Sequence, residues 1–142
     1  MKTGKQNPRE KAMVFDIESA GVQGLKADRA FLVNFGYKWL GEKNVTVLKI
    51  SDTPGYRQET CQDDRWLVRQ ASKVMSQAEA YIAHFGEGFD KPYMQAKFLQ
   101  AGCPPVPDAR LTDTCLLTRK QLCLSSYSLA NLAEFLGVKT QK

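Results

Sequence analysis

The 142-residue sequence has little of what thiolate metal sites and secreted proteins require. It contains a single histidine, His84, and four cysteines, none of which forms a Cys-x-x-Cys pair. A structural zinc site is therefore not expected, because it needs several Cys or His ligands at close spacing. The N-terminus has no apolar segment of the kind that directs secretion. We therefore expect reduced thiols and a cytoplasmic protein of a bacterium, virus or host cell.

Long apolar runs are also missing from the sequence. No stretch approaches the ~18 consecutive apolar residues that a membrane-spanning helix needs, so we expect no membrane partner. The composition is otherwise ordinary, with 43% apolar and 25% charged residues, which excludes bulk disorder. A chain of this length can bury a core as one domain without disulfides or a structural metal.

The excess positive charge lies at the two ends of the chain. The net charge of +5 is made up of +3 in residues 1–11 and +2 in residues 139–142, and residues 12–138 hold 14 basic and 14 acidic side chains. A basic end is more often solvated than bound to a partner, so charge alone does not establish nucleic-acid binding. We predict a flexible basic tail over residues 1–11 and a single domain over residues 12–142.

The pattern of apolar residues predicts an α/β fold. Strands are expected over residues 12–18, 30–40, 45–51, 79–85 and 110–113, and helices over 63–77, 89–101 and 114–122. Ser126 or Ser128 would cap a last helix that Gly137 closes, and Asp63 and Asp64 suit the start of the first helix. A leading three-stranded antiparallel meander followed by alternating helices and strands implies a mixed sheet with helices on its faces.

Three carboxylates are placed where they can do chemistry. Asp16 and Glu18 are two residues apart on a predicted buried strand, so their side chains project from the same face. Unless they simply face water at a strand end, they need a neutralising cation, and oxygen ligands suit Mg²⁺ or Mn²⁺. Asp90 adds a third carboxylate at a predicted helix start, where its ordinary role is that of an N-cap.

These carboxylates lie in segments that resemble a known family of nucleases. Phe15-Asp16-Ile17-Glu18 and Phe89-Asp90-Lys91-Pro92-Tyr93-Met94 resemble the first two motifs of the DEDD 3′–5′ exonucleases, as found in the proofreading domains of family B DNA polymerases and in related stand-alone nucleases. Leu111 to Thr114 and Ser126 to Gly137 are similar to the stretch that precedes the third motif. The resemblance covers residues 12–140 and implies the ribonuclease H-like fold.

The resemblance also implies an activity and a set of site residues. Two Mg²⁺ or Mn²⁺ ions would hydrolyse phosphodiester bonds at the 3′ end of single-stranded DNA or RNA, with DNA favoured. Asp16, Glu18 and Asp90 would be the catalytic metal ligands. The candidate substrate-binding residues are His84, Phe85, Phe89 and Tyr93. Phe89 and Tyr93 have a structural alternative as core aromatic residues, and His84 has one as a hydrogen-bonded histidine.

The sequence departs from the family pattern at two places. Phe85 stands where the family usually has an Asn that helps to hold the substrate. The third motif, a Tyr or His with a downstream Asp, is absent, since no Asp follows Asp113. We therefore expect either a domain that is incomplete at its C-terminus and lacks its last helix, or one that has lost the fourth ligand.

Asp113 is a candidate replacement for the missing ligand, although a turn or a supporting hydrogen bond is its more ordinary role. The departures leave an alternative function open. The chain would then be a catalytically impaired nucleic-acid-binding or assembly module that retains the fold. A related endonuclease needs a late carboxylate too, so it explains the sequence no better.

Overall fold

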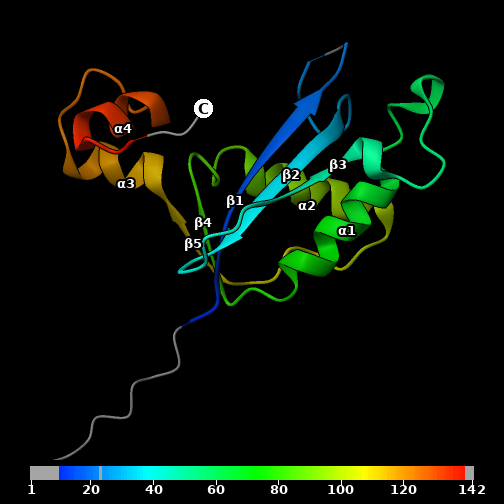
Figure 1. Cartoon of the computed structure of the whole chain (residues 1–142), viewed down its shortest axis with the longest axis horizontal. Coiled ribbons are helices and arrows are strands. Elements are labelled where there is room, and N and C mark those ends of the chain that lie inside the picture. Colours follow the sequence, from blue (N-terminus) through cyan, green and yellow to red (C-terminus); the bar gives the residue numbers. More distant parts are fainter. Residues whose placement is uncertain (1–9, 23, 140–142) are drawn as a thin grey trace, which may run out of the picture.

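The computed structural model describes residues 10–22 and 24–139. Its centre is a five-stranded sheet with the order β3-β2-β1-β4-β5 (Figure 1). The strands are β1 (Ala12–Ala20), β2 (Phe31–Trp39), β3 (Thr46–Lys49), β4 (Ala80–Ala83) and β5 (Arg110–Asp113). The first three form an antiparallel meander, and β4 and β5 add parallel to β1. This arrangement confirms the predicted mixed sheet.

One face of the sheet builds the core. Met13, Phe15 and Ile17 alternate with less buried residues along β1 and are buried beneath two helices, α1 (Arg65–Met75) and α2 (Asp90–Ala101). Phe35 from β2 stacks on Phe15 at a ring separation of 5.8 Å. The same alternation turns Asp16 and Glu18 to the opposite face, as the spacing predicts.

Local sequence signals account for the ends of the helices. Pro92 is the third residue of α2, where a missing backbone N–H costs nothing, and Gly102 ends the helix with a left-handed φ of 69°. Ser128 caps α4 (Leu129–Leu136) by accepting from the Asn131 amide at 3.2 Å. Gly137 closes that helix with a φ of 68°, so both predicted caps of α4 are confirmed.

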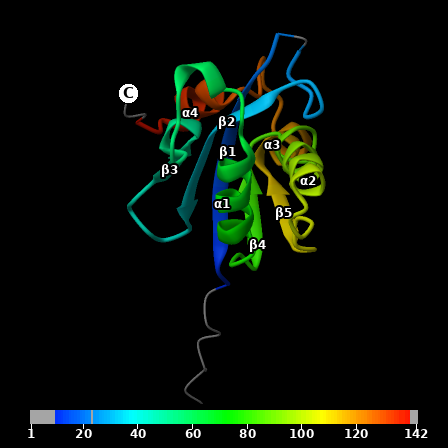
Figure 2. The ribbon, with the colours of Figure 1, turned by 90° about the vertical axis from the view of Figure 1, so that its right-hand side faces the viewer.

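The C-terminal helices lie on the opposite side of the sheet from α1 and α2 (Figures 1 and 2). They are α3 (Thr114–Gln121) and α4, and the Tyr127 hydroxyl shapes their connection by donating to the Leu122 carbonyl at 2.8 Å. Two short 3-10 helices, Ile50–Asp52 and Gln58–Thr60, occupy the link between β3 and α1. The side of the sheet that carries Asp16 and Glu18 therefore faces the two C-terminal helices.

The predicted basic tail is described only at its last two residues, because residues 1–9 lie outside the described part of the chain. Both described residues contact the domain. Glu10 pairs with Arg110 at 2.6 Å, and the Lys11 amide donates to Glu79 at 3.0 Å. All four cysteines are free thiols, as predicted, and no helix in the described residues is long and apolar enough to cross a membrane.

Candidate active site

Asp16 and Asp90 come together where two parallel strands part. β1 pairs with β4 only from Ala12 to Val14, so the part of β1 after Val14 has no partner residue in β4. Asp90, the first residue of α2, enters the space, and its carboxylate forms a hydrogen bond with the backbone of Ile17. The start of α2 thus delivers a carboxylate to the strand that carries Asp16.

The Asp90 carboxyl group is in an environment that disfavours its charge. It is only 3% exposed, and its Oδ2 atom has no hydrogen-bond partner among the described residues. Burial, and after it the nearby Asp16 carboxylate, raise the pKa of Asp90 to about 7 against the opposing effect of backbone hydrogen bonds from Ile17 and Asp90 itself. Two carboxyl groups in this arrangement favour either a shared proton or a bound cation.

Glu18 lies one step further along the same face of β1. Its Oε2 atom accepts a hydrogen bond from the Asn34 side-chain amide at 3.1 Å, across the β1–β2 pair. The register of this pair shifts immediately afterwards, between Glu18 and Ser19. β-Bulges of this kind commonly re-aim side chains next to functional sites. Asn34 therefore orients Glu18, a role that the sequence reasoning missed.

A cleft of about 580 Å³ covers the open face of the sheet beside these carboxylates. Asp16 and Glu18 line it together with apolar residues of the sheet, and Thr114 and Leu129 close it from the side of the C-terminal helices. Gly36 stands opposite Asp16 in the sheet register, so no side chain from β2 fills the space beside Asp16. The cleft gives an extended ligand access to Asp16 and Glu18.

The donor set is suited to a hard divalent cation. Within the described residues, no group of three His, Cys, Asp or Glu side chains is arranged to hold a metal ion. Mg²⁺, however, is commonly held by one or two carboxylates and completes its coordination with water and substrate phosphate oxygens. Asp16 and the unpartnered Oδ2 atom of Asp90 fit that pattern, whereas Glu18 is engaged by Asn34.

Asp113 binds backbone amides instead of facing the other carboxylates. Its Oδ1 atom accepts from Phe85 and Cys115 at 2.9 Å each and from Leu116 at 3.2 Å, and its Oδ2 atom accepts from Glu87 at 3.0 Å. Burial raises the pKa of Asp113, but these four hydrogen bonds outweigh it and hold the pKa below its ordinary value. Asp113 thus joins the loop after β4 to the start of α3.

We expect Asp113→Ala to destabilise the protein by about 2–3 kcal/mol, because it removes a helix cap and leaves loop amides unpaired. Thermal and urea unfolding at neutral pH would measure the loss. Asp113→Asn is the matched control, since its amide oxygen still accepts, and we expect it to lose less. Equal stability of the alanine variant and the wild type would contradict this role.

Two of the predicted substrate-binding residues lie next to this loop. Both ring nitrogens of His84 are occupied, with Nδ1 2.9 Å from the Thr114 hydroxyl and Nε2 2.7 Å from the Tyr127 carbonyl. A carbonyl only accepts, so Nε2 carries the proton and His84 ties β4 to the segment before α4. Phe85 has a positive φ of 59° and remains 45% exposed, with its ring packed over Gly88.

The other two predicted substrate-binding residues belong to the packed interior. Tyr93 is a buried member of the core, and burial raises the pKa of its hydroxyl to about 12, with the charge of Asp64 contributing. Phe89 is partly buried and packs against the Tyr93 ring at a centroid distance of 5.5 Å. Both aromatics pack against each other at the start of α2, and their contact with substrate stays a prediction.

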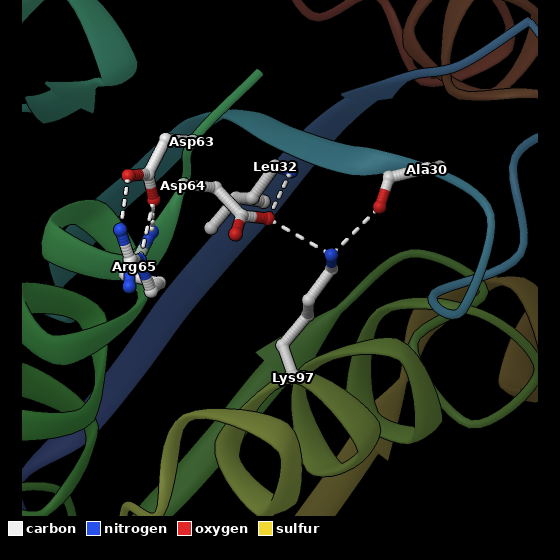
Figure 3. Close-up of polar contacts among 6 residues, drawn as sticks. All are labelled: Ala30, Leu32, Asp63, Asp64, Arg65 and Lys97. Carbon is white, nitrogen blue, oxygen red and sulfur yellow. Dashed lines mark hydrogen bonds and ion pairs between the residues drawn. The ribbon is translucent and has the colours of Figure 1, made fainter. Parts of the chain in front are cut away.

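Sequence reasoning also missed a buried ion pair between Asp64 and Lys97. Asp64 was expected to serve the start of the first helix, but its side chain makes no cap hydrogen bond. Instead, its Oδ2 atom lies 2.9 Å from the Lys97 ammonium (Figure 3). The available signal was the placement of Lys97, seven residues after Asp90 and therefore on the same buried face of α2.

Comparison with known proteins assigns the class that this fold and site indicate. A family model described as the RNase H superfamily matches residues 13–142, and the chain therefore belongs to that superfamily. Among solved structures, it is similar to a family B DNA polymerase from the hyperthermophilic archaeon Pyrobaculum calidifontis, with a TM-score of 0.69 and 18% sequence identity. The match covers 93% of this chain but only 19% of the polymerase chain. No curated protein sequence matches.

Proposed function

We propose that the protein is a metal-dependent 3′–5′ exonuclease that acts on the ends of single-stranded nucleic acid, with DNA favoured over RNA. The observation that carries this proposal is the buried, unpartnered Asp90 oxygen close to Asp16, whose own side chain lines an open cleft. Such a pair costs free energy in the empty protein, and a divalent cation would remove that cost. Membership of the RNase H superfamily, and similarity in fold to part of a family B DNA polymerase, point to the same chemistry.

The carboxylates would divide the work at a bound Mg²⁺ or Mn²⁺. Asp16 and Asp90 would hold the ion, and Asp90 would give up its proton when the ion arrives. Once bound, the ion would supply a hydroxide near neutral pH and stabilise the charge on the attacked phosphate. Glu18, oriented by Asn34, would share with Asp16 the second ion that the family resemblance implies.

The substrate would lie across the open face of the sheet. Phe85 is the one predicted contact whose ring is substantially exposed, and we assign it a stacking role against a base. His84, Phe89 and Tyr93 would support the site through the packing and hydrogen bonds described above. We assign Asp113 to holding the Phe85 loop in place, because both of its oxygens already accept backbone hydrogen bonds.

The direct test is a nuclease assay on a 5′-labelled single-stranded DNA. We expect stepwise release of single nucleotides from the 3′ end with Mn²⁺ or Mg²⁺ and none with EDTA. An oligonucleotide with a blocked 3′ terminus is the control and should resist cleavage. A protein that neither binds Mn²⁺ nor cleaves DNA or RNA would overturn the proposal.

The second candidate function is a nucleic-acid-binding module without catalysis. It is favoured by one observation, that the described residues contain no group of three side chains arranged to hold a metal ion. This function predicts salt-dependent binding that persists in EDTA and in the variant Asp16→Ala. Loss of binding on chelation would favour the exonuclease instead.

Filling the cleft beside Asp16 should separate substrate binding from metal binding. The variant Gly36→Leu is expected to fold, because a Cβ atom at this position meets no atom closer than 3.7 Å. Its side chain would occupy the floor of the cleft, and we expect roughly tenfold weaker binding of single-stranded DNA. Fluorescence anisotropy would measure binding, and a Mn²⁺ titration should remain unchanged. Wild-type affinity for DNA would place the substrate elsewhere.

A further inference from the structure

A buried polar cluster joins α2 to the start of β2, outside the carboxylate site (Figure 3). The Lys97 ammonium contacts Asp64 Oδ2 at 2.9 Å and donates to the Ala30 carbonyl at 2.6 Å. The same Asp64 oxygen accepts the Leu32 amide at 2.8 Å. The side chains of Lys97 and Asp64 are 5% and 11% exposed, so the cluster is shielded from water.

The Leu32 amide belongs to an irregular part of β2. Glu18 is opposite Asn34 and Ser19 is opposite Leu32, which leaves Val33 as an extra residue in the β2 strand. Leu32 and Phe35 are both fully buried although they are three residues apart, which regular strand alternation does not allow. The bulge therefore keeps Leu32 in the core while Asn34 faces the cleft.

The segment from Ala30 to Asn34 makes hydrogen bonds on both sides of the sheet. Asn34 holds Glu18 on the cleft side, while Leu32 in β2 and Ala30 just before it are bound to the ion pair on the core side. Lys97 lies on α2, the helix that begins with Asp90. The ion pair thus connects the helix that delivers Asp90 to the strand that orients Glu18.

We infer that Asp64 and Lys97 are positioning residues that hold the β2 bulge and α2 together and thereby place Glu18 and Asp90 for metal binding. Stability alone does not require a charged pair here, since well-packed apolar residues often stabilise such a position as well or better. What the pair provides is a directed hydrogen bond to the Leu32 amide and another to the Ala30 carbonyl. The part of this inference that concerns metal binding rests on the proposed function, whereas the connection between α2 and the β2 bulge does not.

The first test examines the bulge without any metal. In Lys97→Met, we expect loss of hydrogen-exchange protection at the Leu32 amide and a shift of the Asn34 side-chain amide signals in NMR spectra. The double variant Asp64→Asn/Lys97→Met removes both charges and keeps an acceptor for the Leu32 amide. It therefore tests whether the ion pair holds the β2 bulge if Lys97→Met does not fold. Arg65→Met is the matched control, because it breaks the neighbouring exposed pair with Asp63 at 2.7 Å.

The second test measures Mn²⁺ binding by calorimetry. Loss of a residue that orients metal ligands commonly weakens metal affinity by roughly tenfold or more, and we expect this for Lys97→Met. Met75→Ala, a core substitution outside the Asp64–Lys97 ion pair, should lower the stability of the fold but leave Mn²⁺ affinity unchanged. Wild-type affinity and unchanged Asn34 signals in Lys97→Met would overturn the inference, as would an equal loss of affinity in Met75→Ala. A wild-type protein that binds no Mn²⁺ would overturn the proposed function. The NMR test would still decide whether the Asp64–Lys97 ion pair holds the β2 bulge.

Discussion

Replacing Asp90 with Asn is expected to stabilise the metal-free protein at neutral pH and to abolish its Mn²⁺ binding and nuclease activity. The reason is the difference between the pKa of about 7 in the folded protein and the ordinary value of 3.8. Between these two values the folded state keeps a proton on Asp90 that the unfolded state releases. Stability of the metal-free wild type should therefore fall as pH rises through this window, and Asp90 should contribute no further change above it.

The size of this effect follows from the pKa difference. Three pKa units correspond to at most about 4 kcal/mol, which is a large part of the stability of an ordinary domain. Asn has the same shape and no charge, so Asp90→Asn should be more stable than the wild type near pH 7.5, and the pH dependence should flatten. Urea unfolding in EDTA at pH 4.5, 6 and 7.5 would measure both changes.

Bound Mn²⁺ should make the wild type, and not Asp90→Asn, the more stable of the two proteins. The wild type should release a proton from Asp90 when Mn²⁺ binds near pH 6, which calorimetry in buffers of different ionisation enthalpy detects. Asp28→Asn, which changes an exposed carboxylate paired only at 3.8 Å with Arg29, is the control and should alter neither property. An Asp90→Asn variant with wild-type pH dependence would contradict the buried state of the carboxyl group.

The fold was accessible from the sequence because its signals are local. Alternation along β1 placed Asp16 and Glu18 on one face, and Gly102 and Ser128 marked helix ends that the structure confirms. Hydrogen bonds and apolar periodicity within a few residues determine such features. The meeting of Asp16 with Asp90 was also accessible, but through the family resemblance and not through any local pattern.

The supporting contacts were not accessible because they depend on pairs that are distant in sequence. Asp64 and Lys97 are 33 positions apart, and His84 lies 43 residues from the Tyr127 carbonyl that it contacts. The bulge at Val33 lies in an apolar run from Phe31 to Val33, which does not show which of its residues is the extra one. Such features follow from tertiary packing, which composition and spacing do not encode.

Breaking the buried ion pair with Lys97→Met should give the largest loss of stability among the variants described. Removal of Lys97 leaves the Asp64 carboxylate buried with one backbone amide and no opposite charge. Breaking such a pair from one side typically costs 3–5 kcal/mol, so we expect a loss of about 4 kcal/mol in the free energy of unfolding. Urea unfolding at pH 7 in EDTA would measure it.

The double variant shows whether the stability lost in Lys97→Met comes from the unpaired, buried Asp64 carboxylate. Asp64→Asn/Lys97→Met leaves no buried charge and keeps an oxygen for the Leu32 amide, so we expect it to recover most of the stability that Lys97→Met loses. If it recovers stability but not Mn²⁺ affinity, then the charged pair serves the geometry of the site more than the stability of the fold. A double variant as unstable as Lys97→Met would instead mean that packing around the lysine stem, and not the stranded carboxylate, sets the cost.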